Sequence, residues 1–154
     1  MPHKAPDSAG AWVDDDGLYG ISNGGQKTVA GSDTNSAVST VTTNDIVGMA
    51  FDLDNGKFYM SKNGTFQNSA DPAAGSNGYT ITAPDAVATD TGFYFPAFGD
   101  GNANLIQTGQ FNFGAGPPYA ISSGNADAND HGNFEYEVPS GYFALCTKDI
   151  AEFG

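Results

Sequence analysis

The chain has 154 residues, of which 18 are acidic and 5 are basic, so its formal net charge is -13. A chain of this length suits one domain, which can bury about 70% of the surface of the unfolded polypeptide. The acidity excludes nucleic acid as a favoured partner, because affinity for a phosphate backbone grows with the number of lysine and arginine contacts. No run of about 18 apolar residues occurs, so we expect no membrane span.

The first residues and the single cysteine bear on secretion and on disulfide bonding. The start, MPHKAPDSAG, lacks the apolar segment of a secretory signal. A single cysteine, Cys146, excludes an intrachain disulfide. It lies in the apolar run 142–146, and Lys148 is the only nearby cation in the sequence, so we interpret Cys146 as a small buried side chain rather than a nucleophile. Frequent Gly, Asn, Asp, Ser and Thr with no long run of helix formers predict an all-β chain.

The N-terminal part predicts a polar tail followed by short strands. We interpret residues 1–16 as a tail or linker in which Trp12 is a candidate anchor. Strands are expected at 18–22, 27–30 and 36–41, with turn residues between them. Short strands separated by Gly, Asn and Pro turns are typical of a sandwich or barrel.

Residues 45–64, DIVGMAFDLDNGKFYMSKNG, predict a β-hairpin. Asn55-Gly56 is the signal for a two-residue type I′ turn, and Asn63-Gly64 predicts a second turn. The first strand, 46–53, is apolar on both faces, so we expect it to be the central strand of the sheet. Replacing Phe51 by Ala there should then cost about 3–5 kcal/mol.

The second strand of this hairpin, 57–62, alternates Phe58 and Met60 on one face with Tyr59 and Ser61 on the other. Further strands are expected along the rest of the chain, at 79–82, 91–99, 105–113 and, as an edge strand, 134–138. Two polar segments, 65–88 and 115–133, lie between these strands. A loop as long as 115–133 without structure of its own is usually either functional or disordered.

Four segments in order resemble the SPRY domain family, above all its branch in bacteriophage and metagenomic virion proteins. The hairpin matches the family's most recognisable run at Asp45, Ile46, Val47, Gly48, Ala50, Asp52, Leu53, Asp54, Gly56, Lys62, Asn63 and Gly64. GFYFPAF at 92–98 and FNFG at 111–114 resemble two later strands, and PSGYFALCT at 139–147 resembles the closing segment of the phage branch. The resemblance covers roughly residues 17–150.

This resemblance implies an antiparallel β-sandwich of SPRY or concanavalin-like type over residues 17–154. A complete SPRY domain begins with several strands that residues 1–16 do not supply. Three explanations stay open: a fragment of a longer protein, completion by a neighbouring chain, or a shortened variant. Because an open sheet edge templates pairing, we expect a homo-oligomer or a part of a larger chain.

Catalysis is not expected from the sequence. His3 falls in the tail, and His131 falls in the long polar loop, where we expect it to be exposed to solvent. Glu135 and Glu137 share one polar face of a predicted strand and are read as a solvated rim. The glycine-rich stretches lack the lysine of a phosphate-binding loop.

Calcium is the one cofactor for which the sequence offers candidate ligands, since hard cations prefer oxygen ligands. The best group is Asp127, Asn129 and Asp130, and 14–16 and the pair Asp52 and Asp54 offer others. None of these fits a twelve-residue EF-hand loop. No other cofactor is expected.

The resemblance implies a non-enzymatic module of a virion protein, acting in assembly or host attachment through its loops. The candidate ligand-binding residues are Trp12, Tyr119, Asn125, Asp127, Asn129, Asp130 and His131, a mixture of rigid aromatic and adaptable polar groups. Expected partners are other virion subunits or a host receptor or glycan. A lectin-like carbohydrate-binding module and a cytoplasmic adaptor for peptides are alternatives, and a polysaccharide hydrolase would need two carboxyl groups about 5–9.5 Å apart.

Overall fold

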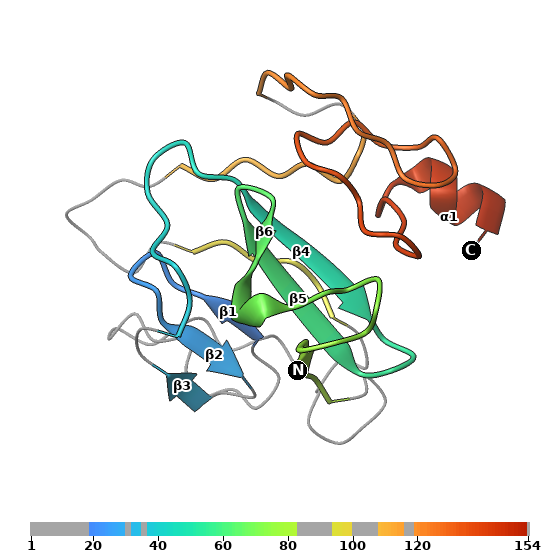
Figure 1. Cartoon of the computed structure of the whole chain (residues 1–154). Coiled ribbons are helices and arrows are strands. Elements are labelled where there is room, and N and C mark those ends of the chain that lie inside the picture. The colour runs from blue at the N-terminus through green and yellow to red at the C-terminus, as the bar shows by residue number, and fades with distance from the viewer. Residues whose placement is uncertain are drawn as a thin grey trace, which may run out of the picture. The chain divides into compact units, whose positions relative to one another are not determined.

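The computed structural model describes residues 19–29, 32–34, 37–82, 94–99, 108–115 and 119–153 (Figure 1). Contacts group the chain into two compact units. The first consists of Met1–Asp45, Asp52–Phe58 and Tyr79–Thr108, and the second of Ile46–Phe51, Tyr59–Gly78 and Gly109–Gly154.

A three-stranded antiparallel sheet belongs to the first unit. Its strands are β1 (Tyr19–Ile21), β2 (Lys27–Val29) and β3 (Ser32–Thr34), in the order β1-β2-β3. β1 and β2 confirm the strands predicted at 18–22 and 27–30. The strand predicted at 36–41 is wrong in its described part, 37–41, because three backbone N–H groups there bond to the turn between β1 and β2 instead of to a strand.

A second antiparallel sheet contains the hairpin that the sequence predicted. It consists of β4 (Val47–Asp52), β5 (Lys57–Lys62), β6 (Thr65–Phe66) and β7 (Tyr79–Thr80). β5 lies between β4 and β6 (Figure 1). β7 pairs with the first two residues of β5, Lys57 and Phe58. Among the described strands β4 pairs with β5 alone, whereas β5 has neighbours on both edges, so β5 and not the predicted 46–53 is central in the sheet as described.

Burial agrees with this order of strands. In β5, Phe58, Tyr59 and Met60 are each at most 1% exposed, and Ser61 is buried as well. In β4, by contrast, Phe51 is 40% exposed. Apolar composition favoured β4 as the central strand, but the side chains on both faces of β5 are buried, including those of Tyr59 and Ser61. The reason lies in close backbone approach: a Cβ on Gly78 would lie 2.6 Å from the Tyr59 ring.

The two predicted turns differ in outcome. Asn63 has φ 48° and Gly64 has φ 79°, so the two-residue turn between β5 and β6 has positive φ at both central positions, as a type I′ turn requires. The earlier turn is a four-residue loop, 53–56, in which Gly56 alone has positive φ. The type I′ prediction for Asn55-Gly56 is therefore wrong. Asp52 explains the difference, because its carboxylate accepts hydrogen bonds from both the backbone and the side chain of Asn55.

The remaining described residues hold little regular structure. Residues 94–99 and 108–113 contain no strand, and the predicted edge strand at 134–138 is reduced to one bridge between Phe134 and Asn125. A short 3-10 turn, η1 (Gln67–Ser69), and one helix, α1 (Thr147–Phe153), complete the elements. The regular structure of the described residues thus consists mostly of antiparallel strands with little helix, as the all-β class requires. None of its helices has the length and apolar character that crossing a membrane requires.

The difference in burial between β5 and β4 predicts which of two substitutions destabilises the fold more. Phe58→Ala should lower the free energy of unfolding by about 3–5 kcal/mol, because it empties a fully buried site. Phe51→Ala should cost about 1–2 kcal/mol, because part of that ring stays in water. Urea denaturation of both variants measures the ranking, and equal losses would contradict it.

Candidate functional site

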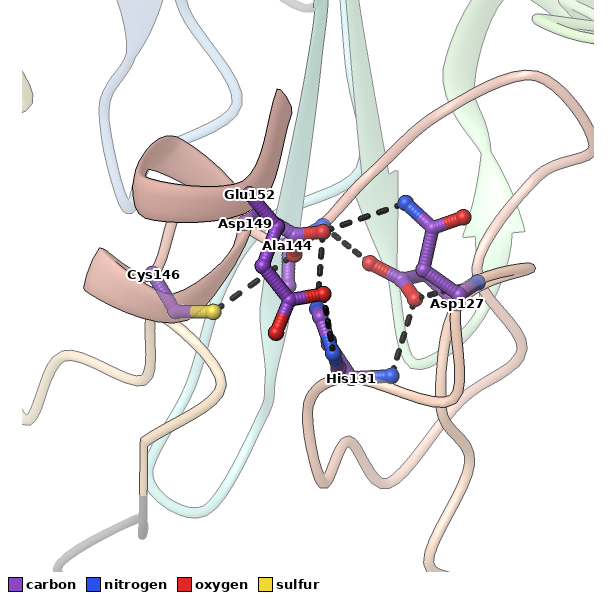
Figure 2. A network of polar contacts seen from close by, with 7 residues as sticks. Asp127, His131, Ala144, Cys146, Asp149 and Glu152 are labelled. Atoms are coloured by element: carbon purple, nitrogen blue, oxygen red, sulfur yellow. Dashed lines mark hydrogen bonds and ion pairs between the residues drawn. The ribbon is translucent and has the colours of Figure 1, made fainter. Parts of the chain in front are cut away.

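The candidate site begins with a tight loop organised by a buried carboxylate. Asp127 is buried, and one of its oxygens, Oδ1, accepts the backbone N–H groups of Asn129 at 2.9 Å and His131 at 3.0 Å. The other oxygen, Oδ2, accepts the backbone N–H of Ala144 at 2.8 Å. The backbone N–H of Asp127 also donates to the carbonyl of His131 at 2.8 Å. Asp127 therefore fixes the loop and ties it to the segment that precedes α1 (Figure 2).

A second set of contacts closes the wider loop around residues 122–135. Asn125 and Phe134 exchange two backbone hydrogen bonds, and the Asn125 side-chain amide donates to the carbonyls of Phe134 and Glu135. At the outer end, the carboxylate of Glu135 accepts the backbone N–H of Ser122 at 2.6 Å and also the hydroxyl of Ser122. The loop is thus held by specific hydrogen bonds at several points.

His131 is buried within this loop, with 5% of its surface exposed. Its Nδ1 lies 2.9 Å from Oδ1 of Asp149, and its Nε2 lies 3.8 Å from Oε2 of Glu152. Both carboxylates come from α1. The prediction of a solvent-exposed His131 is wrong: its backbone N–H donates to the Asp127 carboxylate and its imidazole reaches Asp149 on α1, so the side chain is buried.

Cys146 and Asp149 complete the cluster from the start of α1 (Figure 2). Cys146 is buried, as predicted, and its Sγ donates to Oδ2 of Asp149 at 3.5 Å. Burial by itself raises the pKa of Asp149. Hydrogen bonds from His131, Asn129 and Cys146 lower this pKa by more, so that it lies below the ordinary value for aspartate. The Asp149 carboxylate therefore stays ionised over the neutral range.

The arrangement does not fit a cysteine–histidine relay. Such a relay needs an imidazole nitrogen that accepts the thiol proton and a carboxylate on the opposite ring nitrogen. Here one carboxylate, Asp149, takes both the thiol of Cys146 and the Nδ1 side of His131, and Nε2 faces Glu152. What the cluster does offer is a thiol sulfur, an imidazole nitrogen and a carboxylate oxygen that all lie within 4.8 Å of one another.

The residues predicted for ligand binding have varied positions. Trp12 lies outside the described residues, Tyr119 is half-buried, and Asp130 is exposed with φ 59°. Asn125 and Asp127 bond through their side chains to backbone groups of the loop, and Asp127 also accepts the backbone N–H of Ala144.

The predicted calcium group does not converge on a common point. Both oxygens of Asp127 already accept backbone N–H groups, and a cation there would compete with those donors. Asn129 turns its side-chain amide toward Asp149, 3.2 Å away. Of the other acidic candidates, 14–16 lie outside the described residues, and Asp52 is bonded to Asn55.

Sequence reasoning missed Asp149 and Glu152 as partners of His131. A sequence signal existed, since Cys146, Asp149 and Glu152 follow one another at intervals of three residues, a spacing that a helix places on neighbouring positions. The all-β assignment concealed it, because no helix was expected at 147–153.

Comparisons with known proteins give no relative. No protein-family model matches the chain, and no curated protein and no solved structure matches it at a significant level.

Asp127→Asn should destabilise the loop and the cluster together. The amide keeps a single acceptor oxygen and places an NH₂ donor against a backbone N–H, so we expect a loss of about 1.5–3 kcal/mol in the free energy of unfolding. Chemical denaturation measures it. Asp130→Asn, which changes the same chemical group at an exposed position three residues away, is the matched control and should change stability little.

Glu135 predicts a pH dependence of stability. Hydrogen bonds from the Ser122 side chain and backbone lower the pKa of Glu135, and its effect on stability follows from linkage. This stabilisation is fully present above the unfolded-state pKa of about 4.3 and is lost as the pH falls through the lower pKa of the folded state. Melting temperatures between pH 7 and the acid range should therefore fall less steeply in Glu135→Gln than in the wild type. Glu137→Gln should follow the wild-type curve.

Proposed function

We propose that this chain is a non-enzymatic, SPRY-like module of a bacteriophage-like virion protein, of sandwich type, that acts in assembly or host-surface attachment. Four sequence segments in family order support the proposal, and the hairpin among them forms an antiparallel β-structure at β4 and β5. The virion location and the absence of catalysis both belong to this proposal.

The observation that carries the binding role is the exposure pattern of residues 142–146. Ala144 and Cys146 point inward and are buried, whereas Phe143 is 55% exposed and Leu145 is 62% exposed. Large apolar side chains in water mark interaction surfaces when they occur together on one side of a segment. Here the segment is also held in place, by Ala144 on Asp127 and by Cys146 on Asp149. A rigid backbone that presents two apolar side chains costs little entropy on binding.

Exposed aromatic residues elsewhere in the second unit extend this argument. Phe111 and Phe113 are exposed and stack with a ring-centroid distance of 5.6 Å. They lie in the FNFG segment, and Phe143 and Leu145 lie in PSGYFALCT, so two of the family-like segments carry apolar side chains in water. A second copy or a neighbouring virion subunit that packs against these side chains would remove them from solvent.

The test is the oligomeric state of the double variant Phe143→Ser/Leu145→Ser. We expect the wild type to sediment as an assembly of 15.9 kDa chains and the variant to shift to the monomer, with a melting temperature within a few degrees of the wild type because both side chains are exposed. Leu53→Ser, at a similarly exposed position in the first unit, is the control and should leave the assembly intact.

Host attachment calls for a second measurement on the same variants. A glycan array and binding to host cell surfaces separate a carbohydrate-binding module from a module that binds protein. Deleting residues 122–132 is unsuitable for this purpose, because the deletion would remove the buried Asp127 and His131. A monomeric wild type that binds neither glycans nor cell surfaces would contradict the proposed function.

A further inference from the structure

Three metal-ligating groups of different chemistry meet inside the second unit. They are Nδ1 of His131, Sγ of Cys146 and the carboxylate of Asp149, and all three residues are buried. From this convergence we propose that His131, Cys146 and Asp149 bind a divalent transition-metal ion of the zinc class. The inference does not rest on the proposed binding function, since an assembly module needs no metal.

The distances suit such an ion. Ligand atoms placed tetrahedrally at about 2.0–2.3 Å from zinc lie roughly 3.3–3.7 Å from one another. Nδ1 of His131 is 2.9 Å from Oδ1 of Asp149, and Sγ of Cys146 is 3.5 Å from Oδ2 of the same carboxylate. The two hydrogen bonds therefore hold sulfur and nitrogen on either side of the Asp149 carboxylate at close to the spacing that the metal needs. Since the three ligand atoms lie within 4.8 Å of one another, binding draws them together by at most about 1.5 Å.

Binding replaces protons by the metal. The thiol proton of Cys146 leaves to solvent, and the imidazole exchanges the proton that Nδ1 donates to Asp149 for one on Nε2, so that sulfur and Nδ1 each offer a lone pair. The resulting thiolate and the Asp149 carboxylate carry two negative charges, which balance the charge of a divalent cation in this buried position. An uncompensated buried charge would be costly, so this neutrality favours a divalent ion.

The surroundings of the histidine match those of a metal-bound imidazole. Metal-ligating histidines usually direct their second ring nitrogen to a carboxylate or carbonyl, which fixes the ring. Nε2 of His131 faces Oε2 of Glu152 at 3.8 Å. Asn129 supports the other side by donating from its side-chain amide to Oδ1 of Asp149 at 3.2 Å. The Asp127 carboxylate accepts the backbone N–H of His131 and so helps to fix the position of this histidine.

The donor set also determines which metal fits. A thiolate and an imidazole select zinc and similar borderline-soft ions, whereas calcium takes six to eight oxygen ligands. Three protein ligands leave one tetrahedral position for water or for a group from a bound molecule.

The test titrates the full chain, first treated with a chelator, with Zn²⁺ and separately with Co²⁺. Zn²⁺ should raise the melting temperature by several degrees, since an ion that binds only the folded state stabilises it, and Ca²⁺ at the same concentration should not. Co²⁺ should give a near-ultraviolet thiolate-to-cobalt charge-transfer band and the visible bands of a four-coordinate ion.

Variants locate the site. Cys146→Ser should abolish the charge-transfer band, and Asp149→Asn should weaken Zn²⁺ binding by more than the roughly 10–100-fold that loss of an outer partner causes. Glu152→Gln, which alters only that outer partner, should weaken it within this range. Asp130→Asn is the matched control for Asp149→Asn and should bind as the wild type does. Circular dichroism of each apo variant confirms that it is folded, and His131→Gln replaces any variant that is not.

Two results would overturn the inference. One is a folded wild type that shows neither a thermal shift with Zn²⁺ nor a charge-transfer band with Co²⁺. The other is a band or a shift that survives in folded Cys146→Ser, or that disappears equally in Asp130→Asn, since either outcome would place the ion elsewhere in the chain.

Discussion

The carboxylate of Asp127 connects the two segments on which the candidate site depends. Through its two oxygens it accepts N–H groups from its own loop and from Ala144, which lies 17 residues further along the chain. A buried carboxylate is costly unless it is fully hydrogen-bonded, and here the backbone supplies three donors. The consequence is that His131 and Cys146, which come from different segments, reach the same carboxylate of Asp149. Without the Asp127 carboxylate, the loop would lose the three hydrogen bonds that fix it and tie it to Ala144.

The second sheet shows a comparable dependence on one strand. β5 carries the most buried side chains of the sheet. Glycines in neighbouring segments leave room for the side chains of Tyr59 and Ser61. A Cβ on Gly48 would lie 2.4 Å from Oγ of Ser61, and Gly78 similarly makes room for Tyr59. Gly48 of the hairpin motif and Gly78 outside it thus have a packing role. This explains how polar residues of β5 come to be buried while apolar residues of β4 remain partly in water.

The proposed binding surface and the proposed metal site share one segment, 142–146, but use opposite sides of it. Phe143 and Leu145 face outward, and Ala144 and Cys146 face the Asp127 loop and α1. A bound ion would stiffen the segment from the inside, and stiffening lowers the entropy cost of binding on the outside. The two proposals remain separable, because substitutions at 143 and 145 leave the ligands intact and substitutions at 146 and 149 leave the outward side chains in place.

The sequence by itself determined the all-β class, the strands β1, β2, β4 and β5, a turn at Asn63-Gly64 and the burial of Cys146. These features follow from local rules: periodicity, turn chemistry and apolar neighbours act within a few residues. Tertiary structure alone decided that β5 rather than β4 is central, that residues 37–41 bond to a turn, and that His131 is buried beside α1. Each of these depends on partners far along the chain. His131 and Asp149 are 18 residues apart, and no local pattern predicts that a loop histidine will meet a helix that the composition gave no reason to expect.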